Sequence, residues 1–478
     1  MRPETGDVEG PGWREGVTPV EDVRGDTVDI LGKPFRVAGI QEEKGSKEDI
    51  TIAMGLADAQ LLLDKPDKIN QILALGCNCA GSNLPNIRQQ LADYVTWTRY
   101  HWKDVDVVYA GKAFLTLAMV RIVEEEDCCL LCASGGELAY AVRAGFPMER
   151  VQMHGNNKTP AELVECLDAG IGRIVVDNFE EMERLSALAA ERGANQRVLI
   201  RVTPGVAADT HDFIMTGAED SKFGFGLNQG LAMEAVKRAI ALPGIEFEGL
   251  HMHIGSQIFA LHSYAKAIEV MVGFMRDIKT ETGHDVRMLD VGGGLGVAYG
   301  VPDEPSTVKE FGKIVVDGIK EECERHGLPV PRMAVEPGRS IVANAGVTLY
   351  TVGSIKEIPG VRTYVAIDGG MSDNIRTSLY DAHYEAILAN KADQPREMVA
   401  TIAGKHCESG DIVVRDAHLQ HPEVGDIVCV CATGAYCYSM SSNYNKQVRP
   451  GVVFVADGEW RWSLRRETYD DLMKSDLG

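Results

Sequence analysis

The sequence lacks long apolar runs and is short of positive charge. No stretch of its 478 residues approaches the about 18 consecutive apolar residues of a membrane-spanning helix. Lysine and arginine number 48 against 70 aspartates and glutamates, so the formal net charge is −22. So acidic a chain repels phosphate backbones and anionic membrane surfaces, which argues against nucleic acid or a membrane as a partner. The first residues also lack the basic-then-apolar order of a secretory signal, and we expect a cytoplasmic protein.

The cysteines form neither a disulfide framework nor a metal-binding motif. Their number, 11, is odd and their spacing does not repeat, which suits reduced thiols better than a disulfide scaffold. The pairs Cys77/Cys79 and Cys429/Cys431 are not CxxC, and no second pair completes a zinc set, so we expect no metal. Hydrophobic residues at 45% and charged residues at 25% are ordinary globular values, and the length predicts two domains.

Short β-branched runs alternate with amphipathic helical patterns from about residue 105. Eight such βα units in series are the pattern of a (β/α)8 TIM-like barrel in the α/β class. One linking segment, 161–169, follows Thr159-Pro160, a typical helix cap with proline at the first helical position. The eight predicted strands are 105–109, 129–132, 150–154, 173–177, 197–201, 248–253, 287–291 and 332–336.

The pattern changes after about residue 345, where strands follow one another between Gly, Asp and Pro turns. This favours a C-terminal all-β domain. We therefore divide the chain into an N-terminal segment, 1–85, a barrel, 86–340, and a β domain, 341–478. The N-terminal segment is expected to join the β domain in part and to start with a mobile stretch. The predicted strands of the β domain are 347–358, 363–367, 398–403, 412–415, 426–431 and 452–455.

In a (β/α)8 enzyme the functional side chains lie just past the C-terminal ends of the strands. The predicted strands therefore select a small set of candidates. An amine follows the first strand, two imidazoles end the sixth, a glycine run follows the seventh, and an acid and a guanidinium end the eighth. These residues are Lys112, His251, His253, Gly292–Gly296, Glu336 and Arg339.

Each candidate has an ordinary and a functional interpretation. Lys112 is a surface lysine or, in apolar surroundings, an amine able to form a Schiff base. Gly292–Gly296 is a tight turn or a row of backbone N–H groups for a phosphate. His251 and His253 share a strand face, so a metal is conceivable, but we see no supporting carboxylate or third histidine; one ring stacked on a flat cofactor is as good an explanation. Glu336 is a structural acid or the partner of a protonated pyridine nitrogen. Together they describe a pyridoxal phosphate site.

The β domain adds two polar segments. Cys407 stands beside Glu408 in a polar turn, which makes its thiol a candidate proton donor rather than inert packing. Arg376 and Tyr380 are four residues apart, and their side chains could together bind a carboxylate.

At these motifs the chain resembles the fold-type III pyridoxal phosphate enzymes, the group of alanine racemase and ornithine decarboxylase, and within it the diaminopimelate decarboxylases. The resemblance runs from about residue 105 to 470. The substrate-side segments CESGD and NIRTSLY are similar to those of the diaminopimelate members. The motifs that carry the resemblance are YAGKAF, SGGEL, HGNNKTP, EDSKFGF, HMHIGSQIF, GGGLG, EPGRSIVANAG, DGGMSDNIR, CESGD and GAYCYSMSSNYN.

The resemblance implies a role for each matching residue. Lys112 would form the Schiff base with pyridoxal 5′-phosphate, His253 would stack on its ring, and Glu336 would pair with its pyridine nitrogen. Cys407 would be the proton donor, reaching with Glu408 into the site of the other subunit of a homodimer. The phosphate would be surrounded by Ser256, Gly292, Gly293, Gly294, Gly338, Arg339 and Tyr436. The substrate would be held by Arg339, Arg376, Tyr380, Glu408 and Tyr436.

The activity implied is decarboxylation of meso-2,6-diaminopimelate to L-lysine and carbon dioxide, the last step of lysine biosynthesis. Two alternatives stay open from the sequence. One is a pyridoxal phosphate decarboxylase of another basic amino acid, namely ornithine, lysine or arginine. The other is a homologue without catalytic activity, against which the presence of Lys112, Glu336 and Cys407 argues.

Overall fold

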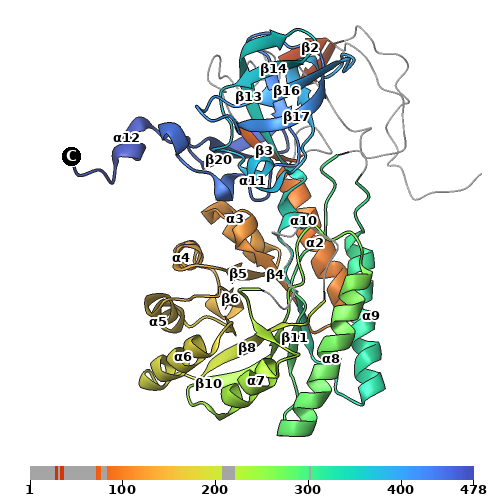
Figure 1. The fold of residues 1–478 in the computed structure, drawn as a ribbon, viewed down its shortest axis with the longest axis vertical. Coiled ribbons are helices and arrows are strands. Elements are labelled where there is room, and N and C mark those ends of the chain that lie inside the picture. Colours follow the sequence, from red (N-terminus) through yellow and green to blue (C-terminus); the bar gives the residue numbers. More distant parts are fainter. Residues whose placement is uncertain (1–26, 31–32, 37–71, 77–82, 207–220, 301–302) are drawn as a thin grey trace, which may run out of the picture. The chain divides into compact units, whose positions relative to one another are not determined.

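The computed structural model describes residues 27–30, 33–36, 72–76, 83–206, 221–300 and 303–478. Eight parallel strands close into a barrel, because β10 pairs with both β11 and β8. From β4 onward the strands neighbour one another in chain order, and β12 returns to β4. The predicted barrel is thus confirmed (Figure 1). Its strands are β4 Val105–Ala110, β5 Cys129–Cys132, β6 Val151–Met153, β7 Arg173–Val176, β8 Gln196–Thr203, β10 Ile245–His251, β11 Met288–Asp290 and β12 Arg332–Val335.

Helices between the strands cover the outside of the barrel (Figure 1). In the predicted cap before α5, the side chain of Thr159 accepts from the backbone N–H of Glu162, and Pro160 stands in the first turn. No helix in the described part of the chain is both long enough and apolar enough to span a membrane. The barrel helices are α2 Asn83–His101, α3 Leu117–Glu125, α4 Gly135–Ala144, α5 Pro160–Ala169, α6 Phe179–Glu191, α7 Leu231–Ala241, α8 His262–Thr282, α9 Val308–His326 and the short α10 Arg339–Val342.

The barrel has two apolar layers. Alternate side chains on each strand point inward or outward. The outward-facing set packs against the helices and forms the main core of the chain. A smaller buried cluster is contributed by alternate positions of neighbouring strands, as a filled barrel interior requires. Its members are Val108, Ala110, Leu131, Val175, Leu199, Met288 and Ala334.

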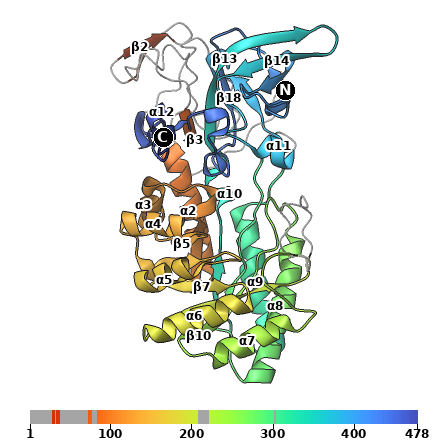
Figure 2. The ribbon, with the colours of Figure 1, turned by 60° about the vertical axis from the view of Figure 1, so that its left-hand side comes forward.

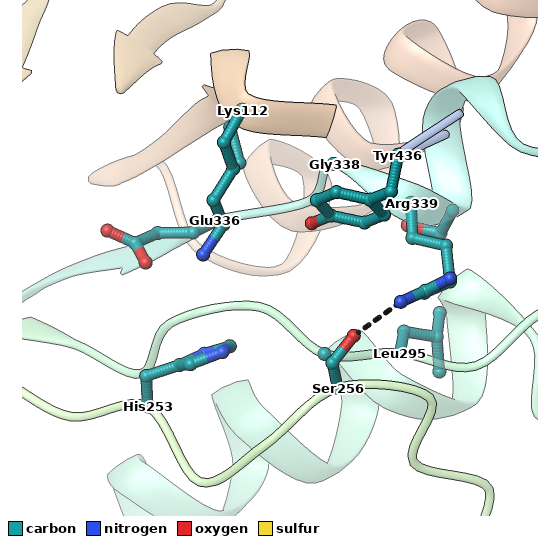
Figure 3. Close-up of a pocket in the computed structure, with 11 residues that line it drawn as sticks. Lys112, His253, Ser256, Leu295, Glu336, Gly338, Arg339 and Tyr436 are labelled. Atoms are coloured by element: carbon teal, nitrogen blue, oxygen red, sulfur yellow. Dashed lines mark hydrogen bonds between the residues drawn. The ribbon is translucent and has the colours of Figure 1, made fainter. Parts of the chain in front are cut away.

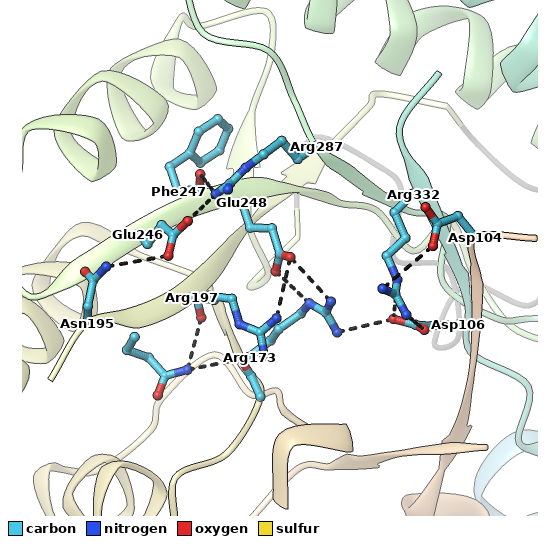
Figure 4. Close-up of polar contacts among 12 residues, drawn as sticks. Asp104, Asp106, Arg173, Asn195, Arg197, Glu246, Phe247, Glu248, Arg287 and Arg332 are labelled. Carbon is cyan, nitrogen blue, oxygen red and sulfur yellow. Dashed lines mark hydrogen bonds and ion pairs between the residues drawn. The ribbon is translucent and has the colours of Figure 1, made fainter. Parts of the chain in front are cut away.

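Charged side chains gather where the barrel strands begin (Figure 4). Arg173, at the start of β7, donates from Nε to Glu248 at 2.7 Å and from its NH1 group to Asp106 at 3.3 Å. Arg332, at the start of β12, donates from Nε to the same Asp106 at 3.1 Å. Arg173 and Asp106 are only 4% and 6% exposed, so removal of one partner would leave buried charge. These ion pairs lie at the opposite strand ends from the candidate residues and stabilise the barrel.

The second unit of structure is a β domain, also as predicted. Its central strand, β13 Ala345–Ile358, pairs with β14, β18 and β3, and with β14 it forms an extended hairpin (Figure 2). Strand β3 Ile72–Gly76 comes from the N-terminal segment and also pairs with β19. The other elements are β14 Arg362–Ile367, α11 Arg376–Tyr380, β15 Ala386–Leu388, β16 Met398–Ala403, β17 Ile412–Leu419, β18 Ile427–Val430, β19 Gly451–Ala456, β20 Glu459–Leu464 and α12 Tyr469–Met473.

Two further short strands precede this unit. β1 Thr27–Ile30 and β2 Lys33–Arg36 pair with each other as an antiparallel hairpin. The expected mobile start of the chain, before about residue 25, lies outside the described residues.

Candidate active site

A pocket opens at the C-terminal ends of the barrel strands, where the candidate residues were expected (Figure 3). Its walls come from the segments that follow β4, β10, β11 and β12, together with one residue of the β domain, Tyr436. Figure 3 places Glu336 on one side and the Ser256–Arg339 pair on the other, with Lys112 extending into the space between. The lining residues are Ala110, Lys112, His253, Ser256, Gly294, Leu295, Glu336, Gly338, Arg339, Ser340 and Tyr436.

Lys112 lies on a single 3-10 turn, Gly111–Ala113, directly after β4. The flanking residues of this turn are buried while Lys112 itself is exposed to the pocket. The backbone N–H of Tyr436 donates to the carbonyl of Ala113 at 2.9 Å, so the β domain is bonded to the turn that carries the lysine. Burial, followed by the positive charge of Lys112, lowers the pKa of His253 well below its usual value. The imidazole of His253 is therefore neutral at physiological pH.

Glu336 is 7% exposed and is surrounded by two imidazoles. Its Oε1 lies 3.0 Å from Nε2 of His154, and its Oε2 lies 3.3 Å from Nε2 of His251. Burial by itself raises the pKa of this carboxyl, but the two histidines outweigh burial and hold the pKa well below its usual range. The neighbouring Asp290 has its pKa raised well above the usual value, by burial first and by Glu336 second. Of the two carboxyls, Glu336 carries the negative charge.

The glycine turn after β11 is shaped by close backbone contacts. A Cβ atom on Gly293 would lie 2.0 Å from the carbonyl oxygen of Glu336, and one on Gly294 would lie 2.3 Å from that of Gly255. Gly294 also has a φ of 115°, a conformation that favours glycine. Gly294 therefore brings backbone rather than a side chain to the pocket, while the N–H groups of Gly292 and Gly293 donate to Asp290 and to the ring of His253.

Arg339 and Ser256 form the polar end of the pocket. Arg339 is 5% exposed, and one of its terminal nitrogens donates to Ser256 Oγ at 3.0 Å while the other donates to the hydroxyl of Tyr299 at 2.5 Å. Its Nε is buried and has no hydrogen-bond partner among the described residues. The guanidinium also lies 4.8 Å from the ring centre of Tyr436, whose backbone has a φ of 60°. A buried cation with a spare donor is suited to an anionic ligand.

The predicted substrate residue Arg376 joins the same region through Tyr436. Its guanidinium carbon lies 5.8 Å from the ring centre of Tyr436 and 5.3 Å from that of Tyr380. Nε of Arg376 donates to the hydroxyl of Tyr384 at 2.9 Å, and that hydroxyl lies 3.6 Å from the thiol of Cys437. Arg376, Tyr380 and Tyr436 thus lie close to one another.

Cys407 and Glu408 lie elsewhere. They occupy the connection between β16 and β17, both are exposed, and neither lines the pocket of its own chain. The backbone N–H of Cys407 donates to Asn445 Oδ1 at 2.9 Å. Next to it, His406 Nδ1 lies 2.8 Å from Asp411, so the conformation of this exposed turn is fixed from within its own domain.

The sequence did not reveal the polar groups that lie behind Glu336. We found no carboxylate or further histidine near His251 in the sequence, and this expectation is wrong: Glu336 and His154 both lie beside it. The three ligand-type atoms lie within 4.8 Å of one another, a composition also seen in metal sites, but here both imidazole nitrogens face the carboxylate. His154 directly follows β6, and Asp290 ends β11. The strand-end rule, applied to every predicted strand, would have selected His154, whereas Asp290 stands one residue inside the predicted strand 287–291.

The class of protein follows from this fold and pocket together with a family model. Residues 85–343 match the model described as "Pyridoxal-dependent decarboxylase, pyridoxal binding domain". This match spans all eight barrel strands and every barrel residue of the pocket. The barrel is therefore that of a pyridoxal-dependent decarboxylase.

Curated relatives and solved structures narrow the class. The chain is 48% identical over 371 residues to the diaminopimelate decarboxylase of Bacillus subtilis (78% of this chain, 84% of the relative). It is 46% identical over 381 residues to that of Mycobacterium tuberculosis (78% and 85%). The crystal structure of diaminopimelate decarboxylase from M. jannaschii superposes with a TM-score of 0.79 at 31% identity (88% of this chain, 94% of that one). That of the Helicobacter pylori enzyme complexed with L-lysine gives 0.77 at 27% identity (87% and 98%). The chain belongs to the diaminopimelate decarboxylase family and is an enzyme of that type.

Proposed function

We propose that the protein binds pyridoxal 5′-phosphate through Lys112 and decarboxylates meso-2,6-diaminopimelate to L-lysine and carbon dioxide, as a cytoplasmic homodimer. The observation that carries this proposal is the arrangement of one pocket, in which an amine, an ionised carboxylate and a polar end with a buried cation face the same space (Figure 3). These are the three groups that an aldehyde, a pyridine nitrogen and a phosphate respectively require.

The residues present fit that cofactor. At the polar end, Arg339 has an unused buried donor, and the glycine turn leaves backbone where a Cβ would collide with Gly255. Ser256 and the backbone of Gly292, Gly293, Gly294 and Gly338 would hold the phosphate together with Arg339 and Tyr436. At the other end Glu336 would face the ring nitrogen, and the neutral ring of His253 would pack against the cofactor. When bound, the cofactor supplies an electron sink for the pair of electrons released from the Cα–carboxylate bond.

The chain's own groups orient the substrate and supply the proton. Arg339, Arg376, Tyr380, Tyr436 and Glu408 would hold the end of the substrate that does not react. The Cα–carboxylate bond breaks and carbon dioxide leaves. A proton from the Cys407 thiol then takes the place of the lost carboxylate at Cα. Ornithine would leave the groups that bind the distal carboxylate unpaired, which we expect to cost several kcal/mol in the transition state.

The positions of Cys407 and Glu408 support a homodimer. Both side chains are exposed on a fixed turn, and the pocket of the same chain does not include them. We propose that the turn enters the pocket of the partner subunit. Mixing Lys112→Ala chains with Cys407→Ala chains tests this, because random exchange makes half of the dimers mixed and each mixed dimer has one intact site. About a quarter of the wild-type activity should return; no recovery after verified exchange would contradict a shared site.

The cofactor assignment is tested by Lys112→Ala. The variant should lose the visible absorption of covalently held pyridoxal phosphate, while Lys237→Ala, a change at a half-exposed lysine in an ion pair with Glu281, should keep it. If the absorption band persists in Lys112→Ala and survives gel filtration, another lysine holds the cofactor and the assignment is wrong.

A further inference from the structure

More polar groups lie behind Glu336 than the proposed cofactor contacts use. They include the imidazoles of His154 and His251, which are 6% and 0% exposed. The two imidazole rings meet edge to face, with ring centres 4.9 Å apart and planes at 79°, so each presents its Nε2 to a different oxygen of the same carboxylate. Neither histidine lines the pocket. Their contact with the pocket is therefore through Glu336.

The two imidazoles approach Glu336 differently: Nε2 of His251 is within hydrogen-bond distance of Oε2 at 3.3 Å, whereas Nε2 of His154 lies 3.0 Å from Oε1 without hydrogen-bond geometry. Burial lowers the pKa of His154 to about 4 even though Glu336 opposes the change, and burial also lowers that of His251. A neutral ring that donates from Nε2 stabilises the ionised carboxylate without adding a positive charge. Each carboxylate oxygen has two lone pairs, so one donor per oxygen leaves the others available to a ligand in the pocket.

Other structure fixes both histidines in place. The backbone N–H of His154 donates to the carbonyl of Cys132 at 2.8 Å. The loop after His154 is held by Lys158, whose ammonium donates to the carbonyl of Gly155 at 2.8 Å and to Glu181 at 2.8 Å. His251 is the last residue of β10 and is paired in register with Asp290 of β11. The backbones of both histidines are therefore held by the barrel, and both rings are buried within it.

We infer that His154 and His251 are positioning residues that keep Glu336 ionised and oriented, so that the ring nitrogen of the bound cofactor retains its proton. This inference rests on the proposed function, which places Glu336 at that nitrogen. Neither histidine would touch the substrate. Their effect would be on the strength of the electron sink and on the retention of the cofactor.

Other charged groups also face this network. Asp290 lies on the strand next to His251, and burial with Glu336 as its neighbour favours its protonated form. Arg201 acts on both histidines, Asp177 acts on His251, and Lys112 acts on His253 from the pocket side. A test based on pH alone would mix these groups. The test therefore compares variants at one pH.

The experiment measures the protonation state of the ring nitrogen directly. Holoenzyme is prepared with pyridoxal phosphate labelled with nitrogen-15 in the ring, and the chemical shift is recorded by NMR for wild type, His154→Leu, His251→Leu and the donor-retaining His154→Gln and His251→Gln. Glu336→Gln serves as the reference for a lost carboxylate, and His284→Leu, at an exposed position, as the neutral control. The dissociation constant of the cofactor is measured for each by equilibrium dialysis.

The leucine variants should shift the nitrogen resonance toward that of Glu336→Gln and bind the cofactor roughly tenfold or more weakly, since one pKa unit corresponds to a factor of 10. The glutamine variants should restore most of both properties. In a Glu336→Gln background, the histidine changes should have no further effect on the resonance. If a leucine variant alone fails to fold, the same comparison is made with that change in the Glu336→Gln background.

Two results distinguish a failure of this inference from a failure of the proposed function. If Glu336→Gln shifts the resonance but both leucine variants keep the wild-type shift, the role of the histidines is refuted and the cofactor assignment stands. If Glu336→Gln itself leaves the resonance unchanged, Glu336 does not face the ring nitrogen and the placement of the cofactor is wrong.

Discussion

Replacement of Lys158 by methionine is expected to destabilise the protein strongly and in a pH-dependent way. The side chain is 2% exposed, and its ammonium donates to two backbone carbonyls, Gly155 at 2.8 Å and Val175 at 2.7 Å, and to Glu181 at 2.8 Å. Removing one partner of a buried ion pair costs about 3–5 kcal/mol. At about 2 °C per kcal/mol for a large domain, the melting temperature should fall by about 6–10 °C.

The pH dependence follows from Glu181. Burial raises its pKa to about 6 although Lys158 opposes the change, so the folded state binds this proton more tightly than the unfolded state. Stability from this group therefore decreases as pH rises from the usual glutamate value toward about 6. Without Lys158 the pKa rises further, and the folded variant continues to lose stability above that pH. The melting temperature of the variant should therefore lie further below that of the wild type at about pH 8 than at about pH 5.

Two control variants test whether the loss of stability comes from the unpaired charge of Glu181. The double change Lys158→Met and Glu181→Leu removes both charges and should recover most of the lost stability. Lys237→Met breaks an ion pair with Glu281 whose side chains are 51% and 46% exposed, and should have little effect. An equal fall in melting temperature at both pH values would refute this reasoning. A double variant as unstable as Lys158→Met would refute it as well.

Three further changes test other parts of the structure. Tyr384→Phe removes the hydroxyl that holds Arg376 and should raise KM for meso-diaminopimelate about tenfold with cofactor affinity unchanged; an unaltered KM would show that Arg376 needs no such support. Glu408→Gln should lower the rate far more than it weakens cofactor binding, measured by carbon dioxide release and dialysis, and an unchanged rate would exclude Glu408 from the site. Arg173→Met, where the barrel strands begin, takes one arginine from Glu248 and from Asp106, of which Asp106 keeps Arg332, and should cost about 3–5 kcal/mol in unfolding free energy without altering KM; a changed KM would argue against a purely stabilising role.

The barrel was predictable because each of its strands is a short, mostly buried run bounded by helical patterns. The rule that functional residues follow strand ends then selected Lys112, Glu336 and Arg339, and all three line one pocket. The rule could not predict which of these side chains contact one another in space. His154 and His251 come together at Glu336 only because β6, β10 and β12 are parts of one closed sheet.

The β domain shows where local patterns fail. β17 runs to Leu419, beyond the predicted end at 415, because the chain passes a register shift near Asp416, whose φ is 47°. β20 was not predicted, although the turn before it, Asp457-Gly458, is a strong hairpin signal with positive φ at both positions. β3 is central to its sheet but lies far from its partners in sequence, so no local pattern indicates it.

The central claim is the reaction, and carbon dioxide release tests it most directly. The purified protein is saturated with pyridoxal phosphate and given meso-2,6-diaminopimelate, L-ornithine, L-lysine or L-arginine in separate reactions. We predict that only meso-2,6-diaminopimelate releases carbon dioxide, with L-lysine formed in equal amount. Release from one of the other three but not from meso-2,6-diaminopimelate would contradict the account, as would no release from any of the four.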